Sequence, residues 1–243
     1  MYTTSMDAAH CVNWQVVSKD NATTWGPSSR VDMGKIEGVL AGPGEGIVLG
    51  RHFPNSKYKG RMVGCGATGY VGGMPQSSPI WTSDDQGKSY QQATGGGLPY
   101  AGVGECQIVE LNNGSLYFNA RNEIRAGNPM PHHRAYSVSH NGGTTWSALK
   151  FAADLEEPTC MAGLINLGGV LYFSNPAETT SRTHMTLKKS TDDAESWHAL
   201  ALIWAGPAAY SAIVPLTSSS LGVVYERGEK SPYEKITIGI VSV

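Results

Sequence analysis

Five polar residues between positions 105 and 226 are of types that can do chemistry together. They are Glu105, Arg121, Arg182, Tyr210 and Glu226. A planar guanidinium can hold a carboxylate through two parallel, charge-assisted hydrogen bonds, and Glu and Tyr side chains can move protons or act as nucleophiles. Taken singly, each residue has an ordinary interpretation as a solvated charge, a loop-end arginine or an aromatic beside a turn. Only a fold that brings them together makes them a site.

A turn motif that occurs four times indicates what that fold is. The copies begin at serines that are 65, 56 and 51 residues apart, and they cover Ser18–Trp25, Ser83–Tyr90, Ser139–Trp146 and Ser190–Trp197. Their shared pattern is Ser-x-Asp/Asn-x-Gly/Ala-x-Thr/Ser-aromatic. Asp and Asn bond their own backbone in tight turns, Gly supplies a positive φ, and the closing aromatic ring can bury itself over the turn. Each copy therefore predicts a hairpin tip, and the recurrence predicts an array of similar units.

Apolar segments repeat in the same order around this motif. Each unit reads as strand, tight turn, strand, long loop, strand and motif. The predicted strands of the later units cover 105–111, 115–120, 134–139, 161–167, 170–173, 184–190, 211–216, 221–225 and 234–241. Four antiparallel strands repeated radially form a β-propeller, and helical periodicity is nearly absent. A β-sandwich is the alternative, but it does not require a repeating turn. We therefore predict an all-β propeller.

The two ends of the chain are irregular in this scheme. The first motif leaves room for about one strand before Ser18, and the last unit stops after its third strand. We therefore expect residues 1–243 to be a single propeller domain that is incomplete at its N-terminus, with about four blades and part of another. Because Arg121, Arg182 and Glu226 each follow the second strand of a unit or its loop, the repeat predicts that they lie at one end of the propeller.

The composition restricts the class of partner. Charged residues make up only 16% of the chain and the net charge is -2, which argues against a nucleic-acid or membrane-surface partner. No apolar run is long enough to be an integral membrane segment, and the first residues show no secretory signal. The four cysteines fit no Cys-x-x-Cys pattern, so we predict buried thiols inside strands. His132 and His133 are adjacent in a Pro-rich loop and are expected to be exposed rather than metal ligands.

The repeated turn resembles the Asp box of the sialidase family, and the resemblance extends to the polar residues. Glu105-Cys106-Gln107 and Phe118-Asn119-Ala120-Arg121-Asn122 resemble the segments with the family's central glutamate and second arginine. The segments around Arg182, Tyr210 and Glu226 resemble those with the third arginine, the nucleophilic tyrosine and the glutamate that orients the first arginine. Order and spacing agree from about Cys11 to the C-terminus. Within the family, the animal-type enzymes of the lysosomal branch are most similar.

This resemblance implies a six-bladed propeller and a retaining exo-α-sialidase that needs no metal and no cofactor. Arg121 and Arg182 would hold the carboxylate that sialic acid carries on its anomeric carbon. A neutral Tyr210 would attack without like-charge repulsion, which is why sialidases depart from the two-carboxylate scheme of other glycosidases. Glu105 would take the phenolic proton. The resemblance adds further candidate substrate-binding residues, Asn119, Asn122 and Tyr70, and places Glu226 among the catalytic group.

The sequence also departs from the family. The first clamp arginine and the acid/base aspartate have no counterpart and are expected before Met1, so we expect this chain itself to be impaired. The substrate implied is terminal sialic acid on glycoproteins, glycolipids and oligosaccharides, including gangliosides. Alternatives are a non-catalytic sialic-acid-binding or structural propeller and a trans-sialidase. The family occupies lysosomal, membrane and cytoplasmic compartments, and the chain carries no signal that selects one.

Overall fold

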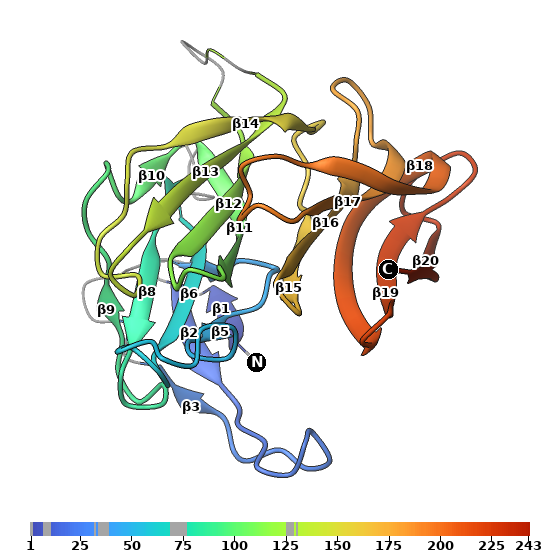
Figure 1. The fold of residues 1–243 in the computed structure, drawn as a ribbon. Helices are drawn as coiled ribbons and strands as arrows, with labels where there is room; N and C mark the ends of the chain where they lie inside the picture. The colour runs from blue at the N-terminus through green and yellow to red at the C-terminus, as the bar shows by residue number, and fades with distance from the viewer. Residues whose placement is uncertain are drawn as a thin grey trace.

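The structure is a computed structural model, and it describes residues 2–6, 11–31, 33, 39–68, 77–124, 129 and 131–243. Every regular element in these ranges is a β-strand, and all the strand pairs within the sheets are antiparallel. The sheets follow one another in chain order, from the blue and cyan strands through the green and yellow ones to the red strands near the C-terminus (Figure 1). The prediction of an all-β fold is confirmed.

The N-terminal half contains the shorter strands. The first sheet has the order β1 (Tyr2–Met6), β2 (Cys11–Gln15) and β3 (Ser29–Arg30). The second has the order β4 (Leu40–Ala41), β6 (Met62–Ala67), β8 (Ile80–Ser83) and β9 (Gln91–Gln92), and β5 (Ile47–Val48) also pairs with β6. A small ladder joins β7 (Ser77–Ser78) to β10 (Tyr100–Ala101).

The C-terminal half contains longer and more regular sheets. One four-stranded sheet has the order β11 (Val103–Glu110), β12 (Leu116–Asn122), β13 (His133–Ser139) and β14 (Lys150–Glu156). The next sheet has six strands in the order β15 (Gly163–Leu167), β16 (Val170–Pro176), β17 (Thr183–Ser190), β18 (His198–Thr217), β19 (Ser220–Arg227) and β20 (Lys235–Ser242). The first half of β18 pairs with β17 and its second half with β19, so one strand is the outer strand of one blade and the inner strand of the next.

The hydrophobic core lies between successive blades because strand alternation sends neighbouring side chains to opposite faces. Ile108 and Phe118 pack toward β6 and β8 in one cluster, whereas Val109 and Tyr117 pack toward β15 and β16 in the next. A third cluster lies between β16–β17 and β18–β19. Each blade of the C-terminal half is thus apolar on both faces, which is the packing expected when sheets stack around an axis.

The four copies of the turn motif close in the same way. In the third copy the Ser139 hydroxyl accepts a hydrogen bond from the Gly143 amide at 3.0 Å, and Asn141 Oδ1 accepts one from the Thr145 amide at 2.9 Å. The same pairs of bonds form in the other copies at 2.8–3.0 Å. Three of the closing rings are buried, but Trp25 is 51% exposed, so the prediction of burial is wrong there. The strand after Trp25, β3, pairs with β2 over only two residues and offers the ring little surface.

The prediction for the cysteines is wrong in part. Cys65 on β6 and Cys106 on β11 form a disulfide with their Cα atoms 6.2 Å apart. The two residues are 41 positions apart in the chain, and only the packing of neighbouring blades brings them together. Cys160 fits the prediction in part, since it is a free and fully buried thiol but lies in the segment between β14 and β15 rather than inside a strand. Burial raises the pKa of the Cys160 thiol to about 11.

Candidate functional site

Glu105 occupies a backbone distortion at the start of an inner strand. The pairing of β11 with β12 shifts register between Gly104 and Cys106, and the residue between them has a φ of 36°. Positive φ is costly for a residue with a side chain, and bulges of this kind re-aim the side chain they carry. The Glu105 carboxylate is thereby directed to hydrogen bonds beyond its own strand, with the residue only 8% exposed.

The Glu105 carboxylate is shared by a phenol and a guanidinium. The Tyr210 hydroxyl donates a hydrogen bond to Oε1, and Arg121 Nη1 donates one to Oε2 at 2.7 Å. Arg121 also forms an ion pair with Glu123, with Nε 2.8 Å from Oε1. Tyr210 lies on β18 and Arg121 on β12, so the cluster joins two blades that are not consecutive in the chain.

The ionisation of the cluster follows from these contacts. Burial, the hydrogen bond to Glu105 and the negative charge of that carboxylate together raise the pKa of Tyr210 above the ordinary value of a phenol. Burial works against the charge of Arg121, but the hydrogen bond and charge of Glu105, with the charge of Glu123, outweigh it and raise the pKa of Arg121. At neutral pH the site therefore presents a neutral phenol beside a fixed positive charge.

Arg182 and Glu226 border the same tyrosine. The guanidinium carbon of Arg182 is 5.9 Å from the centre of the Tyr210 ring. Its Nη2 donates to the carbonyl oxygen of Thr159 at 2.9 Å, and its Nη1 donates to the Tyr233 hydroxyl at 2.7 Å. Glu226 Oε2 accepts a hydrogen bond from the Tyr210 amide at 3.0 Å. The structure thus brings together all five residues from which the sequence argument began.

The three remaining predicted residues behave differently. Asn119 is fully buried and accepts a hydrogen bond from Arg134 Nε at 2.8 Å, and Asn122 is 4% exposed and donates to the His133 carbonyl at 2.9 Å. Both side chains are enclosed by protein in this structure, and their role in substrate binding stays a prediction. Tyr70 lies outside the described residues.

Sequence reasoning missed a buried pair beneath the cluster, Arg134 and Glu157. Both side chains are 0% exposed, and Arg134 Nη1 is 2.7 Å from Glu157 Oε2. Nothing in the sequence indicated this, because arginine and glutamate at strand ends are normally solvated. It also missed Glu123 and Tyr233, the partners of the two arginines.

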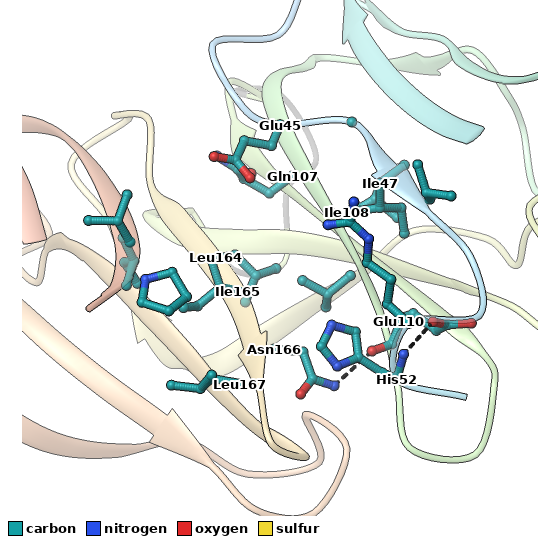
Figure 2. A pocket seen from close by; sticks show the side chains of 17 residues that line it. Glu45, Ile47, His52, Gln107, Ile108, Glu110, Leu164, Ile165, Asn166 and Leu167 are labelled. Atoms are coloured by element: carbon teal, nitrogen blue, oxygen red, sulfur yellow. Dashed lines mark hydrogen bonds between the residues drawn. The ribbon is translucent and has the colours of Figure 1, made fainter. Parts of the chain in front are cut away.

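A cavity of about 360 Å³ lies away from these residues, and its labelled walls come from β11 and β15 with the segment before β6 (Figure 2). Its β11 residues run from Gln107 to Glu110, further along the strand than Glu105. The Glu110 carboxylate there accepts hydrogen bonds from the amides of Gly50 and His52, at 2.9 and 3.0 Å. This cavity is lined mainly by apolar side chains and contains none of the five candidate residues.

The described residues hold no group of three or more His, Cys, Asp or Glu side chains placed to bind a metal ion. They also hold no helix long and apolar enough to cross a membrane.

Comparison with known proteins identifies the family. Residues 1–223 match the BNR repeat-like domain family, and the chain belongs to it. A sialidase from Micromonospora viridifaciens is 29% identical over 209 residues, which is 82% of this chain and 30% of that protein. The Hadza microbial sialidase Hz136 superimposes with a TM-score of 0.72 at 26% identity, covering 96% of this chain and 44% of that one.

A further structure shares the fold at lower identity. The intramolecular trans-sialidase from Ruminococcus gnavus, in complex with oseltamivir carboxylate, gives a TM-score of 0.72 at 18% identity and covers 96% of this chain and 50% of that one. The chain therefore spans between 30% and 50% of the length of these relatives. The finer resemblance to animal enzymes of the lysosomal branch stays a prediction.

Proposed function

We propose that this protein is an exo-α-sialidase that releases terminal sialic acid with retention of configuration, using Tyr210 as nucleophile and Glu105 as its base. The observation that carries the proposal is the hydrogen bond from the Tyr210 hydroxyl to the Glu105 carboxylate, with Arg121 on the other oxygen of that carboxylate. A tyrosine with a raised pKa is a poor nucleophile by itself, and a base within hydrogen-bond reach can activate it by taking the phenolic proton.

The charge around Tyr210 suits a substrate that carries its own carboxylate. Arg182 lies near the Tyr210 ring, and Arg121 binds the same Glu105 carboxylate as Tyr210. Guanidinium groups bind carboxylates through paired charge-assisted bonds. A carboxylate nucleophile would be repelled by such a substrate, whereas a neutral phenol is not. The pairing of a neutral nucleophile with two cations therefore supports sialic acid as the substrate class.

In the proposed first step the Tyr210 oxygen attacks the anomeric carbon, the phenolic proton passes to Glu105, and the bond to the aglycone breaks. The aglycone departs as an anion. In the second step water attacks the same carbon and releases one proton to the solvent, the bond to Tyr210 breaks, and the proton on Glu105 returns to the phenolic oxygen. Two displacements give retention. Glu226 holds the backbone of Tyr210 through its amide and so fixes the position of the attacking oxygen.

In the proposed steps none of the five residues protonates the departing oxygen. General acid assistance contributes about 10²- to 10⁴-fold to rates of this type. We therefore expect this chain to act best on sialosides whose leaving group is an acidic phenol, which departs without a proton. The glycans of glycoproteins, glycolipids and oligosaccharides are the proposed natural substrates, and their alkoxide leaving groups make them the slower class for this chain.

The test is hydrolysis of a fluorogenic aryl sialoside by the protein and by Tyr210→Phe. We expect the variant to lose turnover, and Tyr58→Phe to keep it, since Tyr58 packs against Arg61 near the third turn motif. Unchanged turnover in Tyr210→Phe would remove Tyr210 from its role. Binding of sialic acid without any turnover in the unaltered protein would instead support a sialic-acid-binding module. Transfer to added lactose in preference to water would support a trans-sialidase.

A further inference from the structure

The buried pair beneath the site contacts the backbone beside both arginines. Glu157 Oε1 accepts a hydrogen bond from the Asn122 amide at 2.5 Å, and Asn122 directly follows Arg121. Arg134 Nη1 donates to the Cys160 carbonyl at 2.7 Å, and Cys160 directly follows Thr159, whose own carbonyl accepts from Arg182. Glu157 Oε2 also accepts from the Cys160 amide at 3.4 Å. One ion pair thus holds the chain next to Arg121 and the chain that anchors Arg182.

The backbone next to Cys160 has an unusual conformation. Thr159 has a φ of 55°, a left-handed conformation that a residue with a branched side chain rarely adopts. Such conformations persist only where the surroundings enforce them. The contacts of Arg134 and Glu157 with Cys160 supply that enforcement, because both side chains are fully enclosed and cannot turn toward water.

We infer that the buried Arg134–Glu157 pair positions Arg121 and Arg182 relative to each other, and so determines how well the protein distinguishes a substrate carboxylate. This inference rests on the proposed function. Arg134 and Glu157 are positioning residues, since neither has a surface through which it could touch a ligand. An ion pair that served stability alone would not need to contact the backbone at both Asn122 and Cys160, the neighbours of the two clamp segments.

The test compares binding of two ligands, the unsaturated 2-deoxy-2,3-didehydro analogue of sialic acid and its methyl ester, which lacks the charged carboxylate. The dissociation constant of the ester divided by that of the acid measures recognition of the carboxylate separately from recognition of the rest of the sugar. In Glu157→Gln we expect this ratio to fall by up to about 100-fold, because a misplacement of positioning groups by about 1 Å can cost about that factor. Binding of the methyl ester should change little.

Removing one member of a buried ion pair can unfold a protein, so a second variant is needed. In Arg134→Met/Glu157→Gln no buried charge is left unpaired, and the new side-chain amide oxygen at position 157 can still accept a hydrogen bond from the Asn122 amide. This double variant should fold, lose the contact with the Cys160 carbonyl, and still show a reduced ratio. Faster amide hydrogen exchange at Cys160 than in the unaltered protein is the accompanying structural readout.

The matched control is Lys188→Met. Lys188 is also largely buried and pairs with Glu156 at 2.5 Å, but that pair contacts the carbonyl of Asp154 rather than the clamp segments. This variant should lose stability and keep the ratio. If the folded double variant keeps the ratio of the unaltered protein, the positioning inference is overturned while the proposed function stands. If the unaltered protein shows no preference for the acid over the ester, the proposed function itself fails.

Discussion

The disulfide between Cys65 and Cys106 should contribute strongly to stability because it closes a long loop across two blades. The bonded residues are 41 positions apart, and the loss of chain entropy in the unfolded state for a loop of that length corresponds to about 4 kcal/mol. A domain of ordinary stability has about 5–15 kcal/mol in total. Breaking the bond should therefore remove a large share of the free energy of unfolding.

The assay is urea unfolding followed by tryptophan fluorescence, with and without a thiol reductant. We expect the midpoint to fall in reductant by an amount equivalent to about 4 kcal/mol. The variant Cys65→Ala/Cys106→Ala should be as unstable as the reduced protein and should not respond to reductant. Cys160→Ala serves as the control, since Cys160 is unpaired and its variant should still respond. Equal midpoints with and without reductant in the unaltered protein would refute the reasoning.

Three further outcomes follow from particular contacts. Hydrogen bonds from Ser196 and Ser190 lower the pKa of Asp192 to about 2, so this carboxylate stabilises the fold above about pH 4 and loses that effect as the pH falls toward 2. In acid unfolding followed by circular dichroism, Asp192→Asn should therefore lose stability less steeply between about pH 4 and pH 2 than the unaltered protein, and Asn141→Asp more steeply. Arg61→Lys should cost about 1 kcal/mol in urea unfolding because lysine cannot reproduce the paired bonds of Arg61 to Asp84 at 2.8 and 2.7 Å; a variant as stable as the original would show that the pair contributes nothing. Glu105→Gln should lower kcat for an aryl sialoside by about 10²- to 10⁴-fold through loss of the general base, and kcat within a factor of about two of the original would exclude that role.

The scaffold was predictable because its signal is repeated. Four copies of one turn motif marked the hairpin tips, and Asn141 shows that the motif tolerates Asn for Asp because the same backbone bonds form. The repeat predicted that Arg121, Arg182 and Glu226 lie at one end of the propeller, and the resemblance added Glu105 and Tyr210 to this group.

Other features depend on tertiary packing that no local pattern encodes. The Cys65–Cys106 bond joins neighbouring blades. The positive φ of Glu105 accompanies a register shift between β11 and β12 that the local sequence does not predict. The burial of Arg134 contradicts the usual preference of arginine for water and becomes intelligible only with Glu157 and Asn119 in place. Local sequence likewise did not indicate that Asn119 is fully buried against Arg134.

The central claim is that Tyr210 forms a covalent bond to the sugar with the help of Glu105. The most direct test uses a sialyl fluoride with a second fluorine at C3, whose good leaving group permits the first step and whose C3 fluorine slows the second. Peptide mass spectrometry of the treated protein should then find the added sugar on Tyr210 and on no other residue, and Tyr210→Phe should remain unlabelled. Turnover of the reagent with no adduct, or an adduct at any residue other than Tyr210, would contradict the account.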